Sequence, residues 1–267
     1  MQTFRDAFAY RDVLMALTAK ELKAQYRNMA LGFLWALLNP LVMIVVLSFA
    51  LIVFMGLGMD APARIVVALI PYNFFTYCVS ACTSSVTGNS SLVKKIHFPR
   101  QILPFSVILT SLVHFGVQSL LVVLVLLLFP HGGDVLTFNL LWVVPVLVVH
   151  IGLCVGFGML VAALNVVFRD TRYLVESLLT VMFWLSPVIY DARSYLQIES
   201  GDLTWLQRAY FLNPMAGILD SYRAVLFYGT APDPFVLGSA LVLTMLLGAV
   251  GMLTFWRHER QFADLIQ

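Results

Sequence analysis

The sequence predicts an all-α polytopic membrane protein with six transmembrane helices, an interfacial amphipathic helix before the first span and short external re-entrant helices before the last. Composition is the first observation: 61% of the residues are hydrophobic and only 11% are charged, which leaves too little polar surface to cover a soluble domain. The second is the length of the uncharged stretches, several of which exceed the roughly 20 residues that a spanning helix needs. They are continuously apolar and lack the alternation of a membrane β-barrel.

The six spans are read between consecutive charged residues. The fifth is the shortest, because it reaches a marginal length only by including Glu176. Pro40 and Pro187 remove a backbone hydrogen bond inside their spans, so both helices are expected to be kinked. The whole chain, 1–267, is treated as one transmembrane domain. The predicted spans are 31–55, 64–86, 103–129, 139–166, 173–190 and 234–256.

Basic residues indicate the orientation. An even number of spans puts both termini on one side, and 12 of the 16 Lys and Arg residues lie in the segments on that side. Cytoplasmic segments carry an excess of Lys and Arg, so both termini are expected in the cytoplasm.

Residues 4–27 are expected to form the interfacial helix. At helical spacing one face collects apolar residues and the opposite face collects Arg5, Lys20, Lys23 and Arg27, a pattern that suits anionic lipid or a partner. The alternative is an anchor that only fixes topology. The apolar face consists of Phe4, Phe8, Met15, Ala19, Leu22 and Tyr26.

The main cytoplasmic loop, 88–100, has apolar residues with no obvious core to enter. A short turn of helix ended by Pro99 is expected there. A docked protein partner would explain the apolar residues, and burial against the ends of the loop's own helices is the alternative. The contact candidates are Leu92, Val93, Lys94, Lys95 and Ile96.

The external loop, 191–233, is long and rich in aromatic residues. Asn213 and Pro214 read as the N-cap and first residue of a helix with apolar residues at helical spacing, including Tyr222. So apolar a helix is expected to dip back into the outer leaflet, packed on the spans. For single residues such as Trp205, a place in an interfacial aromatic belt is the alternative.

The sequence carries no recognisable catalytic set. It has no phosphate-binding P-loop, HExxH or GxSxG motif, so we expect a chain that is not an enzyme and binds no cofactor or metal. The net charge of +2 without a basic tract argues against nucleic-acid binding. Glu176, His114 and His150 are ionisable residues within the spans, for which helix-to-helix hydrogen bonds are an alternative to function. Cys78 and Cys82 share a helix face, where packing is favoured over metal binding.

Several passages resemble the transmembrane subunit of ABC transporters that export polysaccharides such as O-antigen, capsule and teichoic acid. Their order and spacing cover nearly the whole chain, although no single motif is diagnostic. The matching segments are 27–40 (RNMALGFLWALLNP), 168–175 (FRDTRYLV), 183–190 (FWLSPVIY) and 212–215 (LNPM), the last followed by a helix that ends in LFYG.

The resemblance implies a homodimer in the bacterial cytoplasmic membrane, paired with two copies of an ATP-binding subunit that binds the ATP and magnesium. The substrate would be a glycan on a polyprenyl-pyrophosphate lipid, moved through a channel between the two permeases. It also implies that the interfacial helix and the 88–98 loop contact the ATPase, that the lipid head group enters near Arg27, Leu31 and Gly32, and that the external re-entrant helices gate the exit. The gate candidates are Trp205, Asn213, Pro214 and Tyr222.

Aromatic rings are expected to line such a channel, because flat faces stack on sugar rings without demanding one sequence. The candidates are Trp35, Phe183, Trp184 and Tyr190, for which lipid-facing packing is the alternative.

Arg169 and Arg172, with Arg27, could bind a pyrophosphate by bidentate hydrogen bonds, or could serve only as topology anchors. The alternative functions are an ABC exporter of a small hydrophobic molecule and an ATP-independent secondary transporter or channel. A membrane-embedded enzyme would need a carboxylate or metal cluster, which the sequence does not display.

Overall fold

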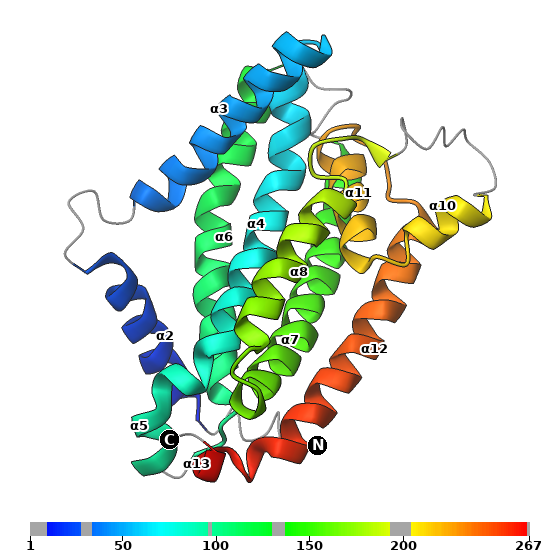
Figure 1. The fold of residues 1–267 in the computed structure, drawn as a ribbon. Coiled ribbons are helices and arrows are strands. Elements are labelled where there is room, and N and C mark those ends of the chain that lie inside the picture. Colours follow the sequence, from blue (N-terminus) through cyan, green and yellow to red (C-terminus); the bar gives the residue numbers. More distant parts are fainter. Residues whose placement is uncertain (1–9, 28–33, 96–97, 130–136, 193–203, 266–267) are drawn as a thin grey trace.

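The computed structural model describes residues 10–27, 34–95, 98–129, 137–192 and 204–265, which form a bundle of α-helices (Figure 1). No strand occurs among these residues, so the all-α prediction is confirmed. Short 3₁₀ turns, η2 (Thr87–Asn89) and η3 (Phe138–Trp142), connect helices. The helices are α2 (Arg11–Tyr26), α3 (Trp35–Met55), α4 (Ala61–Ser85), α5 (Ser90–Lys95), α6 (Ile102–Leu128), α7 (Val143–Val167), α8 (Thr171–Leu185), α10 (Trp205–Tyr210), α11 (Pro214–Leu226), α12 (Pro234–Glu259) and α13 (Phe262–Leu265).

Five segments in the described part of the chain are long and apolar enough to cross a membrane: α3, α4, α6, η3 with α7, and α12. The predicted fifth span is shorter than expected, because α8 has 15 residues and measures about 22 Å at 1.5 Å per residue. It ends at Leu185 since the following Ser186 precedes a proline and adopts an extended conformation, with ψ of 149°. Pro187 therefore lies beyond the helix, and the predicted kink there is wrong. Pro40 does lie inside α3.

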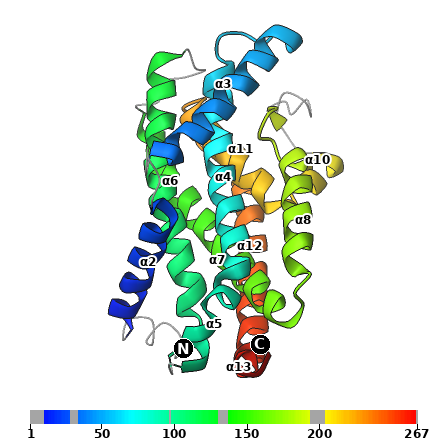
Figure 2. The same ribbon diagram turned by 60° about the vertical axis from the view of Figure 1, so that its left-hand side comes forward.

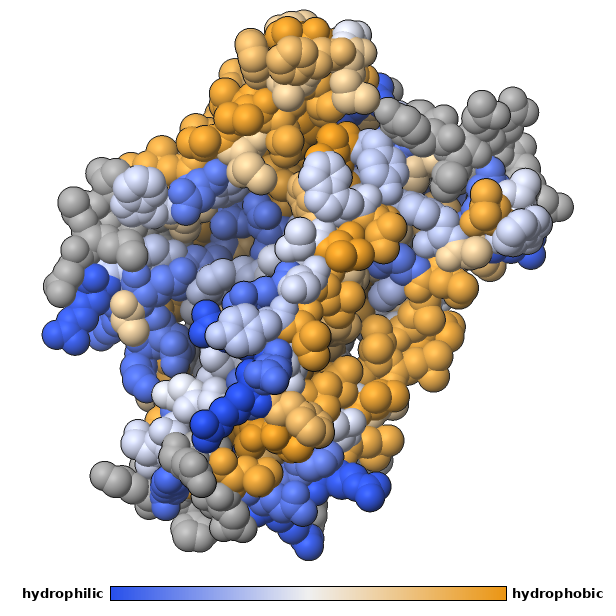
Figure 3. All heavy atoms as spheres, in the orientation of Figure 1, coloured by the Kyte–Doolittle hydropathy of each residue, from blue (hydrophilic) through white to orange (hydrophobic). Residues whose placement is uncertain are grey.

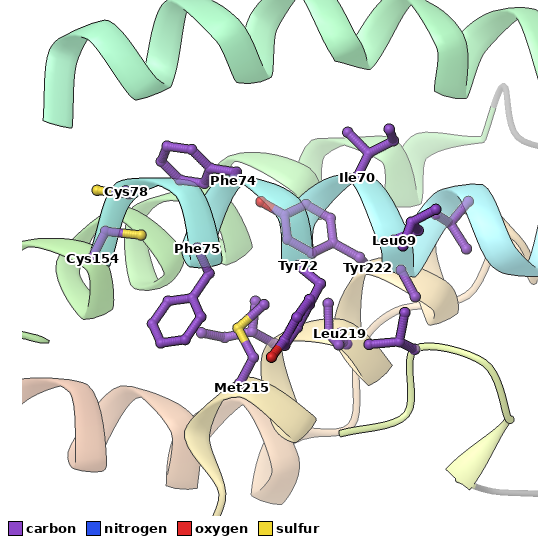
Figure 4. Packing of buried hydrophobic residues seen from close by; sticks show 14 of the residues in the cluster. Leu69, Ile70, Tyr72, Phe74, Phe75, Cys78, Cys154, Met215, Leu219 and Tyr222 are labelled. Carbon is purple, nitrogen blue, oxygen red and sulfur yellow. The ribbon is translucent and has the colours of Figure 1, made fainter. Parts of the chain in front are cut away.

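The α4 helix is the centre of the bundle, with 72% of its most apolar segment buried against 22% for α3 and α12. Most of its side chains are buried because α6, α7, α8, α3 and α11 surround it, and its exposed residues, such as Tyr77 and Ser80, lie on one side. Figure 4 shows Tyr72, Phe75 and Cys78 of α4 meeting residues of α7 and α11, such as Met215. The chain thus builds its core around one span and leaves the others largely exposed.

The α2 helix packs against α6, but on a different face from the predicted one. Leu17 and Thr18 are buried and Leu14 is half-buried, whereas Met15 and Ala19 of the predicted apolar face are exposed. Leu22 and Tyr26 of the predicted face are half-buried, so the observed contact surface overlaps the predicted one only at the end of the helix. Residues 4–9 of the predicted helix lie outside the described part of the chain.

The first described residues of α2 and the C-terminal α13 lie at the same end of the bundle (Figure 1). At this end, which we call the base, Phe255 and Phe262 pack edge to face with ring centroids 5.1 Å apart. The opposite half holds α10 and α11, and α11 packs among α4, α7 and α12. The predicted helix after Asn213 is confirmed, with the Asn213 side chain accepting a hydrogen bond from the Met215 amide at 3.1 Å. It ends at Leu226, short of Gly229, which has a φ of 66°.

Candidate functional site

The α8 helix presents a polar face away from the bundle. It is buried along one row, Thr171, Val175 and Leu179, and stands at the edge of the bundle in Figure 2. Arg172 and Glu176 on its exposed side form an ion pair at 3.1 Å. The exposed side also includes Ser177, Thr180 and two large aromatic residues, Tyr173 and Trp184, so the polar row runs beside exposed apolar residues, which are Leu174, Leu178, Val181 and Leu185. A helix between apolar spans with such a face is costly in contact with lipid, so this side requires water, a polar ligand or another protein surface.

A polar groove of about 590 Å³ lies beside this face, between α2, α3, α4 and α6. A second hollow of about 550 Å³, lined by Lys20, Glu21 and Asn89, continues it towards the base and shares Gln25 and Tyr77 with it. Amide, hydroxyl and aromatic side chains dominate the lining. The polar and aromatic residues of the larger groove are Gln25, Tyr26, Trp35, Asn39, Asn73, Phe74, Thr76, Tyr77, Ser80, Ser111, His114, Phe115 and Gln118.

Hydrogen bonds between helices organise the wall of the groove. The Tyr26 hydroxyl lies 2.8 Å from His114 Nδ1, and the Gln25 side-chain oxygen lies 2.8 Å from His114 Nε2. Tyr77 donates to the same Gln25 oxygen at 2.9 Å, and Gln118 donates to the Ala36 carbonyl at 3.2 Å. For His114 the alternative of a helix-to-helix hydrogen bond is thus the observed one. The network fixes α2 on α4 and α6 and leaves a wall rich in donors and acceptors.

The groove and the α8 face together form one hydrophilic band. Figure 3 shows blue residues crossing the molecule between the orange surfaces of α3 and α12. Of the predicted channel aromatics, Trp35 begins α3 and lines the groove. Phe183 is half-buried, edge-on to Tyr72 at 5.3 Å, whereas Trp184 is 66% exposed. Tyr190 lies beyond α8, with its hydroxyl 3.0 Å from that of Tyr210.

The predicted head-group residues occupy two separate places. Arg27 is exposed at the end of α2, while Arg169 lies in the turn between α7 and α8 and Arg172 in the first turn of α8 (Figure 1). The structure does not gather these three arginines into one cluster. Leu31 and Gly32 lie outside the described part of the chain.

The predicted ATPase contact is only partly available for docking. Val93 is 4% exposed and packs in the base cluster that also contains Phe255, so its assignment as a contact residue is corrected in favour of burial within the chain. Leu92 is half-buried and Lys94 is exposed. Lys95 ends α5, and Ile96 lies outside the described residues. The reason is that α5 packs on α13, which gives its apolar side a core to enter.

The structure does not bring the predicted gate residues together at one place. Trp205 is 79% exposed at the start of α10, and Asn213 and Pro214 begin α11. Tyr222 is 2% exposed, with its ring 5.9 Å from that of His150, so it belongs to the interior and not to an exposed gate. The amphipathic pattern of α11 could not reveal this, because α11 is covered on all sides.

Sequence reasoning missed a buried charged cluster near α11. Its arginines are Arg64 and Arg223, and Arg223 is only 2% exposed. Arg64 lies 2.6 Å from Asp60 and 3.8 Å from Asp191. Arg64, Asp191 and Arg223 line a cavity of about 270 Å³ together with Tyr190. The only signal in the sequence was an Asp and an Arg, at 220 and 223, inside an otherwise apolar helix.

The remaining titratable candidates offer little chemistry. His150 is fully buried among Phe74, Phe115 and Tyr222. Cys78, Cys82 and Cys154 are free and buried. Among the described residues no group of His, Cys, Asp or Glu has the arrangement of a metal site.

Comparison with known proteins agrees with this architecture. Residues 12–227 match the family model described as "ABC-2 type transporter". The chain is 32% identical to the O-antigen export system permease protein RfbA of Myxococcus xanthus, over 98% of each chain. It is 27% identical to an RfbA of Klebsiella pneumoniae, over 96% of this chain and 95% of that one. With its several apolar helices, the chain is a multi-pass membrane protein that belongs to the ABC-2 type transporter family.

Proposed function

We propose that this chain is the permease half of an ATP-driven exporter that moves lipid-linked polysaccharide across the bacterial cytoplasmic membrane. Two copies form the channel at their interface, and two copies of a separate ATP-binding subunit supply the energy. Both termini lie in the cytoplasm. The curated relatives named as O-antigen export permeases support the cargo class.

The hydrophilic band is the observation that carries this proposal. An exposed row with Arg172, Glu176 and Thr180 on a helix among apolar spans is unfavourable against lipid, but it suits the wall of a water-filled path. The neighbouring groove offers amides, hydroxyls and rings, which match the hydroxyl groups and C–H faces of sugars. A small hydrophobic cargo would gain little from so polar a lining. The band therefore favours a hydroxyl-rich chain.

The residues proposed to bind the lipid head group and the ATP-binding subunit are chosen by their charge and exposure. Arg27, Arg169 and Arg172 are available for the pyrophosphate of the carrier, with Arg27 at the groove side and the other two at the α8 side. Leu92, Lys94 and Lys95 of α5 contact the ATP-binding subunit. ATP and magnesium bind to that subunit, and this chain binds no cofactor.

The first test is purification of the tagged chain from native membranes in mild detergent, followed by mass spectrometry. A stoichiometric ATPase with a phosphate-binding P-loop and a polyprenyl-linked glycan are the expected companions. A chain that purifies alone as a stable oligomer would refute ATP-driven export and favour a secondary transporter or channel.

Cysteine cross-linking tests the position of the channel. The three native cysteines are buried, so a short bifunctional thiol reagent in native membranes reacts with an introduced one. Ser177→Cys on the exposed face of α8 should give a cross-linked dimer, whereas Leu253→Cys on the exposed apolar side of α12 should not. Dimers from Leu253→Cys and none from Ser177→Cys would place the dimer interface at α12 and would refute a channel lined by α8.

A further inference from the structure

The α8 helix is joined to α10 and α11 by polar contacts that the proposed channel does not require. Along its length α8 rests on the bundle by the buried row described above, with one hydrogen bond from Tyr72 to the Leu179 carbonyl at 2.5 Å. Beyond Leu185 the chain continues as residues 186–192, which we call the tether. Ser186, Val188 and Ala192 of the tether are fully buried.

Arg223 of α11 is the central contact to the tether. Its Nη2 donates to the Pro187 carbonyl at 2.8 Å and to the Val188 carbonyl at 3.4 Å. These carbonyls lie past the end of α8, so donors from elsewhere have to satisfy them. Arg223 supplies such donors from a helix 35 residues further along the chain.

Three further contacts join the tether to α10, to α11 or to residues beside α11. The Asn213 side-chain amide donates to Ser186 Oγ at 3.0 Å, and the hydroxyls of Tyr190 and Tyr210 lie 3.0 Å apart. Tyr228 donates to the Asp191 carboxylate. Burial, reinforced by this carboxylate, raises the pKa of Tyr228 to about 12, so the hydroxyl remains a donor throughout the physiological range. Every one of these partners belongs to α10, α11 or the residues that directly flank α11.

The energetics favour a positioning role for Arg223. Nε and Nη1 of this buried guanidinium have no hydrogen-bond partner, which makes the residue expensive for stability alone. A well-packed apolar side chain would fill the same space at lower cost, but it could not hold the two carbonyls of the tether in a fixed direction. The remaining charges around Arg223 are Asp191, Asp220 and Arg64.

We propose that Arg223 is a positioning residue that fastens the tether to α11, so that α8 and the unit of α10 and α11 move as one body during transport. This inference rests on the proposed function, in which the exposed face of α8 lines the channel. A displacement of α8 that widens the channel then also displaces α10 and α11. The channel and its external exit therefore open together and not one after the other.

Hydrogen exchange with mass spectrometry tests the inference on the complex of permease and ATP-binding subunit in lipid nanodiscs. In the wild type the amides of the tether are protected, and ATP with vanadate changes the protection of α8, α10 and α11 together. In Arg223→Met the tether loses protection, and α10 and α11 no longer respond to nucleotide while α8 does. Arg223→Lys keeps a cationic donor and restores part of the coupled response. The same change at the exposed Arg208 of α10 is the matched control and leaves the tether protected.

The exchange pattern separates positioning from general destabilisation. If Arg223→Met also exposes the core of α4, Tyr228→Phe decides, because it removes the hydrogen bond to Asp191 without adding or removing a charge; it should loosen the tether alone. A tether that stays protected in Arg223→Met, or in Tyr228→Phe when that variant decides, overturns the inference. The inference is also overturned if α10 and α11 of Arg223→Met respond to nucleotide as they do in the wild type. If the ATP-binding subunit does not bind, the proposed function is refuted instead. Comparing the protection of the tether in the wild type and in Arg223→Met, both without nucleotide, would then still test the contact made by Arg223.

Discussion

The crossing of α7 and α12 gives a stability prediction whose size follows from the geometry. A Cβ built on Gly251 would lie 2.1 Å from the Gly156 carbonyl oxygen, and one on Gly156 would lie 2.7 Å from the Gly248 backbone. Cβ atoms do not approach other atoms within 3.0 Å, so Gly251→Ala forces the two backbones apart by about 1 Å. Overpacking of this kind costs about 1–3 kcal/mol, and the obstacle is backbone, which cannot rotate away as a side chain would.

Gly248→Ala is a matched control on the same helix, because a Cβ there meets nothing within 4 Å. Alanine is favoured over glycine in a helix by about 1 kcal/mol, so the control should be at least as stable as the wild type while Gly251→Ala is less stable. Both are compared by thermal unfolding in detergent, monitored by the loss of the monodisperse peak in size-exclusion chromatography. A Gly251→Ala variant that melts at or above the temperature of Gly248→Ala would refute the close approach of these helices.

Three further predictions concern transport and assembly. Leu92→Asp should abolish co-purification with the ATP-binding subunit while leaving the permease folded, whereas Val93→Asp should lower the folded yield because it buries a charge; normal binding by Leu92→Asp would remove α5 from the interface. Tyr26→Phe removes a hydrogen bond worth about 1 kcal/mol and should speed proteolysis at the end of α2, an effect that unchanged cleavage kinetics would contradict. Arg27→Ala and Arg172→Ala each remove a charged hydrogen bond worth about 1.5–3 kcal/mol and should slow glycan export roughly tenfold or more; wild-type export would leave these residues as topology anchors.

The sequence predicted the helical architecture well because spanning helices follow from local composition. Uncharged stretches of about 20 residues have few alternatives in a membrane, and the N-cap at Asn213 needs only neighbouring backbone. The end of the fifth span was misjudged for a local reason as well, since hydropathy continues through Pro187 although the backbone conformation required before a proline ends the helix at Leu185.

Site predictions were weaker because each depends on what packs against a residue. The repeat of apolar residues placed Met15 and Ala19 on the apolar face of the first helix, but that helix packs on α6 through Leu17 and Thr18 and leaves Met15 and Ala19 exposed. Val93 looked free in a cytoplasmic loop and is buried against the C-terminal segment, which is about 160 residues away in the chain. Long-range partners of this kind leave no periodic signal.

The sequence by itself determined that the chain is a multi-pass helical membrane protein and where its apolar segments lie, because the cost of polar groups in hydrocarbon acts residue by residue. Only the tertiary structure decided that α4 is the buried centre, that α8 turns a polar face outward beside the groove, and that Arg223 is interior. These features depend on which helices are neighbours, and close packing between segments far apart in the chain fixes that choice. The charge of Arg223 is visible in the sequence, but the carbonyls that it binds are brought to it only by the fold.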